Sequence, residues 1–277
     1  MKKRKKWPII VSPAFALLAI CALYNGLTVR EYFLASPQIK EPVTLVLISD
    51  LHNSRFGKNQ KDIIGLIKKQ SPDCILITGD IVDDIEKTEN AKAFLLGIKG
   101  ICPVYYVTGN HEYWTRQISD IRDMVTQCGG VILSDTFEVV EVKGNRILVA
   151  GIEDPDKQLY EDAAYSQQKA MQTSFGGIAK REEYKVLLAH RPERIGKYLP
   201  YGFDLIVSGH AHGGQVRIPF LLNGLYSPSQ GLFPKLAGGQ YNYDDTTLIV
   251  SRGTSFRWIT PRVFNPPEVV VIRLSGE

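Results

Sequence analysis

Cysteine is scarce in this chain of 277 residues: there are four, and no two of them stand in a Cys-x-x-Cys spacing. Four cysteines are too few for a disulfide framework in a chain of this length, and their spacing argues against a zinc site built from thiolates. Cys74 and Cys102 open apolar runs, so we expect both to be small buried hydrophobic residues.

Excess charge of either sign is also lacking beyond the first six residues. The formal net charge is +4, and the run from Lys2 to Lys6 supplies five positive charges. The rest of the chain then has 28 basic and 29 acidic residues, a net charge of −1. This balance argues against a nucleic-acid partner. A hydrophobic content of 44% with 22% charged residues is typical of a globular protein.

Charged residues are absent from position 7 to position 29, a stretch of 23 residues. About 20 apolar residues are enough to cross a bilayer as a helix, and the basic residues 1–6 should keep that end in the cytoplasm. We therefore predict a single-pass membrane anchor at residues 7–29, with everything after Arg30 outside. Two alternatives stay open: a cleaved signal peptide, although no small-x-small site follows the run, and a lipoprotein at Cys21, although Ile20 is bulky for such processing.

From residue 43 onward, strand-like and helix-like segments alternate. Short apolar runs rich in β-branched residues predict strands, and apolar residues at helical spacing predict helices. The predicted strands are residues 44–49, 74–78, 104–107, 186–189, 205–208, 247–250 and 269–274, with a hairpin of residues 137–142 and 146–150, and the predicted helices are residues 59–69 and 91–98. This alternation indicates a sheet with crossover helices in one α/β domain, residues 43–277.

Side chains able to bind a metal end five of these apolar runs: Asp50, Asp80, Asn110, His190 and His210. Sites in α/β sheets form at the carboxyl ends of the strands, so we expect the five to converge. Each has a plainer explanation when taken alone. An aspartate or asparagine after a strand is often a helix cap or turn residue, and a single histidine is more often an interior hydrogen-bonding residue.

All five histidines of the chain belong to this pattern. His52 stands two residues after Asp50, His111 follows an asparagine, and His210 and His212 form a Gly-His-x-His motif. Histidine is the commonest metal ligand and the usual proton carrier near neutral pH. Histidines interleaved with carboxylates and an amide in this order indicate a metal-dependent hydrolase.

Together these motifs resemble the signature of the calcineurin-like metallophosphoesterases. The motifs that carry the resemblance are Asp50-x-His52, Gly79-Asp80, Gly109-Asn110-His111-Glu112, the isolated His190 and Gly209-His210-x-His212. With its basic and then apolar amino terminus, the chain resembles the membrane-anchored bacterial branch of that family. The resemblance implies two mixed β-sheets packed as a sandwich and flanked by helices, preceded by one transmembrane helix, with the catalytic domain on the extracytoplasmic side of the cell membrane.

The resemblance also implies a site for two divalent metal ions. Asp50, His52 and His212 would hold the first ion, Asn110, His190 and His210 would hold the second, and Asp80 would bridge them. Mixed nitrogen and oxygen ligands suit Mn, Fe or Zn better than Mg or Ca. Two such ions about 3.5–4 Å apart suit an in-line displacement by an activated hydroxide.

His111 is the one histidine that we do not expect to bind a metal. It should face the substrate and donate a proton to the departing oxygen, as the catalytic acid. Asp83 either orients this imidazole or forms a solvated pair with Asp84, and Glu112 is expected to anchor the loop. Three arginines are candidates for bidentate contacts to phosphate oxygens, with ordinary surface roles as the alternative: Arg217, Arg252 and Arg262.

The predicted function is metal-dependent hydrolysis of a phosphodiester or pyrophosphate in a lipid-linked or cell-envelope substrate. One alternative is a broad-specificity phosphomonoesterase or nucleotidase, and another is a catalytically silent, membrane-anchored module that binds phosphorylated ligands. A further alternative is another metal hydrolase, such as an amidohydrolase, but that class would not explain a bridging Asp80 together with the ligand Asn110. Apolar residues at 220–222, 225–226, 232–233 and 256–258 are expected either to form an apolar lip for an acyl chain or bilayer, or to pack in the core. No oligomeric state is predicted.

Overall fold

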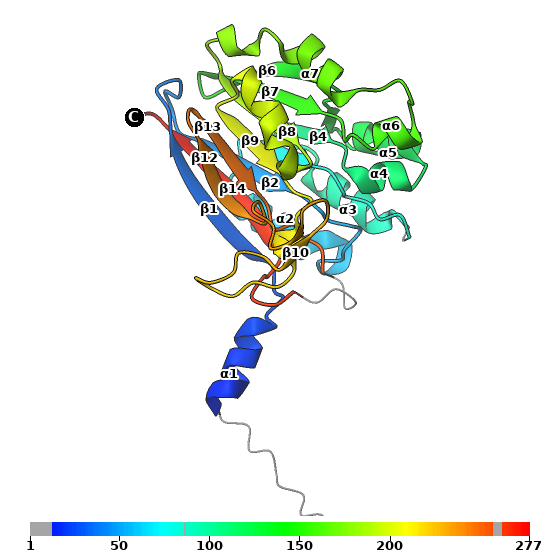
Figure 1. The fold of residues 1–277 in the computed structure, drawn as a ribbon, viewed down its shortest axis with the longest axis vertical. Coiled ribbons are helices and arrows are strands. Elements are labelled where there is room, and N and C mark those ends of the chain that lie inside the picture. Colours follow the sequence, from blue (N-terminus) through cyan, green and yellow to red (C-terminus); the bar gives the residue numbers. More distant parts are fainter. Residues whose placement is uncertain (1–12, 86, 257–261) are drawn as a thin grey trace, which may run out of the picture.

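The computed structural model describes residues 13–85, 87–256 and 262–277. Two six-stranded sheets pack against each other, and helices cover their outer faces (Figure 1). The predicted pair of mixed sheets flanked by helices is therefore confirmed. The helices are α1 (Pro13–Ala22), α2 (Lys61–Lys69), α3 (Glu89–Ile98), α4 (Asn110–Trp114), α5 (Ile118–Gln127), α6 (Lys157–Tyr160), α7 (Gln167–Phe175) and α8 (Ile195–Tyr198), with the short 3-10 helices η1 (Lys58–Gln60), η2 (Ile178–Lys180), η3 (Pro192–Arg194), η4 (Leu199–Tyr201) and η5 (His212–Gly214).

The first sheet has the strand order β1-β14-β2-β3-β4-β5. Its strands are β1 (Thr28–Ala35), β14 (Glu268–Ser275), β2 (Val43–Ile48), β3 (Cys74–Thr78), β4 (Val104–Val107) and β5 (Val131–Ile132). The strands from β2 to β5 run parallel, whereas β14 is antiparallel to β2 and parallel to β1. The sheet is mixed because the last strand of the chain lies between β1 and β2.

The second sheet has the strand order β12-β13-β9-β8-β7-β6. Its strands are β12 (Gly239–Tyr243), β13 (Thr246–Val250), β9 (Leu205–Ser208), β8 (Tyr184–Ala189), β7 (Asn145–Ile152) and β6 (Thr136–Val142), and β10 (Tyr226–Ser227) pairs separately with β11 (Gly231–Leu232). The four central strands are parallel and the two edge strands are antiparallel to their neighbours. The predicted hairpin is β6–β7, and its turn residues Lys143 and Gly144 both have the positive φ that a two-residue hairpin turn favours.

The alternation of side chains along the strands divides the core into layers. Leu45 and Leu47 of β2 lie between the sheets with Leu188 of β8, whereas Val46 and Ile48 pack toward α2 and α3. None of these five side chains is more than 1% exposed. Burying one such side chain contributes about 1.5–3 kcal/mol, so the strands and the loops that follow them are firmly positioned.

The outer layers bury the apolar faces of the helices. Helices α2, α3 and α5 cover the first sheet, and α7 and α8 cover the second. In the second layer Phe175 of α7 meets Phe203 edge to face, with ring centroids 5.7 Å apart. Cys74 is buried as expected, whereas Cys102 is only partly buried.

The amino-terminal segment differs from the predicted anchor. Residues 1–6, the predicted cytoplasmic end, and residues 7–12 lie outside the described residues. Helix α1 has ten residues, and within the described ranges no helix has the length and apolar character needed to cross a membrane. The expected end of the anchor at Val29 is wrong, because Val29 belongs to β1 and pairs with Val269 of β14. The first sheet therefore includes residues that precede position 43.

Candidate metal centre

The seven predicted metal ligands lie in the segments that follow the carboxyl ends of five strands, and we call this group the strand-end site. Asp50 and His52 follow β2, Asp80 follows β3, Asn110 follows β4, His190 follows β8, and His210 and His212 follow β9. Because β2, β3 and β4 are parallel in one sheet and β8 and β9 in the other, their loops emerge together. The packing of the two sheets thus brings all seven side chains close to one another.

Two glycines allow the backbone to approach the carboxylates of this site. A Cβ atom on Gly109 would lie 2.2 Å from Oδ1 of Asp80, and one on Gly209 would lie 2.4 Å from Oδ2 of Asp50. Both distances are far shorter than a van der Waals contact, so any side chain here would displace a carboxylate. The glycine that precedes Asn110 and the one that precedes His210 are therefore packing requirements.

The backbone of the site lies largely in the left-handed region. Five of the seven residues have positive φ: Asp50 (52°), His52 (44°), Asp80 (52°), His210 (65°) and His212 (47°). Aspartate and histidine tolerate this region better than most residues, but each such position still costs about 1–3 kcal/mol and is found preferentially at functional sites. The loops thus adopt an unfavourable backbone that directs these side chains to one place.

One half of the site is centred on His190. Nδ1 of His190 lies 2.7 Å from the carbonyl oxygen of Thr78, so this nitrogen carries the proton and donates it. Nε2 of His190 lies 3.1 Å from Oδ1 of Asn110, 3.2 Å from Oδ2 of Asp80 and 3.1 Å from Nδ1 of His210. Four potential ligand atoms from four loops therefore face one another.

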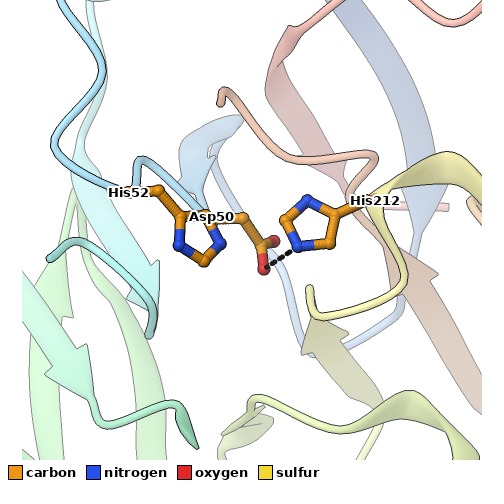
Figure 2. A group of neighbouring side chains, drawn as sticks. All are labelled: Asp50, His52 and His212. Atoms are coloured by element: carbon orange, nitrogen blue, oxygen red, sulfur yellow. Dashed lines mark ion pairs between the residues drawn. The ribbon is translucent and has the colours of Figure 1, made fainter. Parts of the chain in front are cut away.

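The other half consists of Asp50, His52 and His212, which point toward one another in Figure 2. The pair drawn there joins Nε2 of His212 to Oδ1 of Asp50 at 3.8 Å. The rings of His52 and His212 have centroids 5.1 Å apart. Ligand atoms of the three residues all lie within 4.8 Å of one another, close enough to hold one ion.

Asp80 lies between the two halves. Its Oδ2 is 3.2 Å from Nε2 of His190 and 3.6 Å from Nε2 of His52. Its Oδ1 accepts a hydrogen bond of 2.9 Å from the backbone amide of His111. A single carboxylate thus contacts both groups and is also fixed by the backbone.

The chemistry of these donors fits divalent cations. In neutral His190 the proton is on Nδ1, so Nε2 presents a lone pair to a carboxylate oxygen, an amide oxygen and a second imidazole. Lone pairs that face one another in a buried site repel unless a cation lies among them. Imidazole nitrogens with carboxylate and amide oxygens are the donor set of Mn, Fe and Zn.

The pKa values of the site histidines also indicate that a positive charge is favoured at the centre of the site. Burial lowers the pKa of His190, but the adjacent carboxylates of Asp80 and Asp50 outweigh it and raise the value to about 10. Burial lowers the pKa of His210 and His212 well below the usual range, and the charge of neighbouring imidazoles adds to this effect. With no metal bound, His190 is therefore an imidazolium at neutral pH, and its second proton, on Nε2, lies among the facing oxygen and nitrogen atoms, where a metal ion would replace it.

His111 lies at the edge of the site, and one of its ring nitrogens is within 4.8 Å of ligand atoms of His52 and Asp80. Its side chain is 15% exposed, and its ring contacts His52 edge to face at 4.4 Å and Trp114 at 4.5 Å. Nδ1 of His111 lies 2.9 Å from Oδ1 of Asp84 and 3.9 Å from Oδ2 of Asp83. Asp84 is therefore the closer partner of this imidazole, whereas Oδ2 of Asp83 lies nearer to Nδ1 of His52, at 3.4 Å.

Glu112 holds the loops of the first sheet together, as expected from its place in the sequence. Its carboxylate accepts hydrogen bonds from the backbone amides of Asp80 at 2.8 Å, Ile81 at 2.9 Å and Gly109 at 2.7 Å. Burial and the nearby carboxylate of Asp80 raise the pKa of Glu112 to about 7. This side chain fixes the ends of β3 and β4 relative to each other.

A cavity of about 250 Å³ opens beside the site, and Arg262 reaches it. The cavity is lined by His52, His111, His212, Gln215, Tyr226, Pro228, Ser255 and Arg262. Arg262 is only 2% exposed; its Nη1 donates to the carbonyl of Arg252 at 2.7 Å, and its Nη2 has no hydrogen-bond partner within the described part of the chain. Arg217 and Arg252, the other two candidates, line a different cavity.

Ser229 is a neighbour of the site that sequence reasoning missed. Its Oγ lies 3.2 Å from Nε2 of His210 and accepts a hydrogen bond of 3.1 Å from Nη1 of Arg191. In the tautomer with a proton on Nε2, His210 donates to Ser229 and keeps the lone pair of Nδ1 toward His190. Ser229 lies in the turn between β10 and β11, and no local pattern links this turn to a histidine before it.

Comparison with known proteins shows the family of this chain. The family model of the calcineurin-like phosphoesterases matches residues 43–214, the part of the chain that carries all seven residues and His111. An uncharacterised metallophosphoesterase of Campylobacter jejuni is 28% identical, over 100% of this chain and 74% of its own length. An uncharacterised metallophosphoesterase of Helicobacter pylori is 33% identical, over 91% of this chain and 65% of its own length.

Among solved structures, the NAD nucleotidase of Haemophilus influenzae has a similar fold. It matches 77% of this chain and 45% of its own length, with a TM-score of 0.54 and 14% sequence identity. This likeness concerns the fold alone. The chain spans just under two thirds of the Helicobacter relative and less than half of the nucleotidase.

Proposed function

The chain belongs to the calcineurin-like phosphoesterase family and is a metal-dependent phosphoester hydrolase, and from this premise we propose that it uses two divalent ions at the strand-end site. Asp50, His52 and His212 hold one ion, Asn110, His190 and His210 hold the other, and Asp80 binds both. The observation that carries the proposal is the convergence of buried carboxylate, amide and imidazole atoms around Nε2 of His190. When bound, ions such as Mn, Fe or Zn supply Lewis acidity and lower the pKa of water.

His111 is the proton donor in this proposal. Its place on the wall of the cavity, outside the ligand group, leaves it free to meet the departing oxygen of the substrate. In the imidazolium form the ring forms an ion pair with Asp84, whose Oδ1 lies 2.9 Å from Nδ1, and the proton on Nε2 is available for transfer. General acid catalysis of this kind is worth roughly 10²–10⁴-fold in rate.

Arg262 binds the phosphoryl group before and during the reaction. Burial lowers the pKa of Arg262 to about 10, against the opposing effect of Asp50, so the guanidinium still carries its charge at neutral pH. Arg262 lines the cavity and its buried Nη2 has no hydrogen-bond partner within the described residues, so in this proposal a non-bridging phosphate oxygen becomes the partner of the guanidinium. Arg262 therefore orients the phosphorus toward the strand-end site.

We assign the substrate to the cell envelope, as a phosphodiester or pyrophosphate in a lipid-linked molecule. The support is the uncharged stretch of residues 7–29 after a basic run, together with the aromatic side chain of Tyr226 in the cavity wall. In this arrangement residues 1–6 are cytoplasmic and the catalytic domain is outside the bacterial cell membrane. The modest volume of the cavity, about 250 Å³, favours a second candidate, a phosphomonoesterase or nucleotidase that acts on small substrates.

The test is activity toward mono-, di- and pyrophosphate substrates, soluble and lipid-linked, after chelation and after the return of Mn, Fe or Zn one at a time. We expect no turnover in chelator, recovery with at least one of these metals, and the highest kcat/KM for a lipid-linked diester or pyrophosphate. Preference for a soluble monoester would replace the envelope substrate by the second candidate. Turnover that persists in chelator would contradict the two-ion proposal, and metal binding without turnover on any substrate would indicate a silent binding module.

A further inference from the structure

A second cavity, of about 450 Å³, lies apart from the strand-end site and is lined by arginines. Arg30 of β1, Arg217 and Arg252 form its polar wall, and the turn of residues 218–222 forms an apolar rim. Phe264 also lines this cavity, and its backbone amide donates a hydrogen bond of 2.7 Å to the carbonyl of Ala22, the last residue of α1. The cavity therefore lies next to the point where α1 joins the rest of the molecule.

Positive charge in this cavity exceeds what the neighbouring carboxylates balance. Arg252 pairs with the buried Glu268 at 2.5 Å. Arg217 donates from Nη2 to the neutral amide oxygen of Asn223, and its buried Nη1 has no hydrogen-bond partner within the described ranges. Arg30 is exposed on the edge strand of the sheet. Burial and the charge of Arg252 lower the pKa of Arg217, so an anion bound beside it would stabilise this guanidinium.

The rim of the cavity exposes apolar side chains to solvent. Phe220 is fully exposed, Leu221 is 84% exposed and Ile218 is 45% exposed. The turn is nevertheless ordered by its own backbone, because Ile218 and Leu222 exchange hydrogen bonds of 2.8 and 2.9 Å. At its tip Phe220 has a φ of 68°, an unfavourable value for an aromatic residue. The chain thus maintains a strained turn that projects apolar side chains away from the core.

Helix α1 presents the same kind of surface at the same end of the molecule (Figure 1). Leu17 and Ile20 are each more than 60% exposed, so the described parts of the chain leave both side chains largely uncovered. This arrangement, an ordered apolar turn and an exposed apolar helix next to an arginine cavity, is complementary to the surface of a bilayer. Apolar side chains enter the acyl region, and arginines meet the anionic headgroups.

We propose that this cavity binds the phosphate headgroup of an anionic bilayer lipid while Ile218, Phe220 and Leu221 enter the bilayer beside it. The occupant is a membrane rather than a second copy of the chain, because a symmetric pair would bring Arg30 and Arg217 against their own copies. The proposal concerns a surface distinct from the strand-end site and does not depend on how that site catalyses.

The test uses the full chain reconstituted into vesicles of phosphatidylcholine alone and of phosphatidylcholine mixed with phosphatidylglycerol. Phe220→Trp reports the environment of the turn, and Leu159→Trp is the control, because Leu159 is 75% exposed in α6, on the far side of the molecule from α1 (Figure 1). The fluorescence of the native tryptophans is subtracted with the unmodified chain. We expect the emission of Phe220→Trp to shift to the blue and to be quenched at least about twofold more by brominated phosphatidylglycerol than by brominated phosphatidylcholine.

Arg30→Gln and Arg217→Gln should abolish this preference for the anionic lipid and leave hydrolysis of a soluble substrate unchanged, which shows that the variants fold. Quenching of Leu159→Trp should be absent. Equal quenching by both lipids would overturn the headgroup site, and an unshifted emission of Phe220→Trp in both vesicles would overturn the membrane contact. A blue shift that grows with the number of chains per vesicle would instead assign the surface to a second copy of the chain.

Discussion

Two buried polar clusters lie side by side in this protein, and they differ in how their charges are balanced. The strand-end site gathers carboxylate, amide and imidazole atoms that face one another with few donors among them. A second group, which we call the Glu153 cluster, consists of Glu153, Asp154, Arg122 and Arg191. Its two carboxylates are each 1% exposed, as deeply buried as Asp80.

In the Glu153 cluster every carboxylate oxygen has a donor from the chain itself. Glu153 accepts hydrogen bonds from Thr108, Ser134, Tyr113 at 2.7 Å and Arg122 at 2.8 Å. Asp154 accepts two from Arg191, at 2.8 and 3.0 Å.

The difference between the clusters separates a structural network from a binding site. Both contain buried acids, so burial alone does not identify a site. A carboxylate with complete hydrogen bonding needs nothing further, whereas lone pairs that converge need an external cation. The comparison predicts that changes in the strand-end site affect metal binding and turnover, and that changes in the Glu153 cluster affect stability.

The largest effect on turnover should come from His111→Ala. We expect kcat to fall by roughly 10²–10⁴-fold, because the departing oxygen loses its proton donor, while the bound metal is unchanged because His111 is not a ligand. Steady-state kinetics with metal analysis of the same sample measures both quantities. Asp84→Asn removes only the charged partner that orients the ring, so it should lower kcat by less than His111→Ala does. Undiminished turnover of His111→Ala would remove the assigned role.

Asp80→Asn tests the bridging role of Asp80, and the same substitution in the Glu153 cluster, Asp154→Asn, is the control. Loss of the carboxylate that binds both ions should lower kcat/KM by more than about 100-fold, the upper range for outer partners of a metal ligand, and should weaken metal binding in calorimetry. Asp154→Asn should lower the free energy of unfolding and leave metal affinity unchanged. Equal loss of metal in both variants would show that the distinction between the clusters is false.

Ser229→Ala should produce a smaller change at the strand-end site. His210 loses the partner of its Nε2, so the tautomer that faces the site is less favoured, and metal affinity should fall by about 10–100-fold. Ser166→Ala is the matched control, because Ser166 is exposed and caps α7 by accepting from the backbone amide of Lys169. That variant should lose about 1 kcal/mol of stability and no metal affinity. A Ser229→Ala chain with native affinity would assign the serine to the turn alone.

Glu153→Gln should have the smallest effect on turnover, within about twofold per folded molecule, and should cost about 3 kcal/mol of stability, as expected for breaking a buried ion pair. Burial raises the pKa of Glu153, but Arg122 and three hydroxyl donors outweigh it, so the pKa in the folded state is below its usual value. The stabilisation is therefore complete above the unfolded value, about 4.3, and is lost as pH falls through the folded pKa. The free energies of unfolding of the unmodified chain and of Glu153→Gln, measured with urea, should therefore converge below about pH 4. A difference that stays constant at all pH values would contradict this prediction.

The sequence was sufficient to predict the parts of the fold that have a local signal. The runs before Asp50 and Asp80 are continuous and rich in β-branched residues, as buried parallel strands are, and each ends at a polar residue. The sequence could therefore predict both that the candidate metal ligands follow the strands and that these side chains lie close together. The edge strand β1 was missed because half of its side chains are exposed and its partner β14 is about 240 residues away.

Other contacts of the site depend on tertiary structure alone. Ser229 reaches His210 only because the turn between β10 and β11 folds back over it. The sequence offered three equivalent arginines, and only the packing shows that Arg262 reaches the cavity of the site. Asp83 and Asp84 are adjacent in sequence, and the geometry alone assigns the closer contact with His111 to Asp84.

The most direct test of the central claim is the number and position of ions bound by the purified chain. A crystal soaked in manganese, with anomalous scattering recorded, should show two peaks per chain. One peak should lie among Asp50, His52 and His212, the other among Asn110, His190 and His210, with Asp80 in contact with both. No peak, or peaks only at other surfaces of the molecule, would contradict the account.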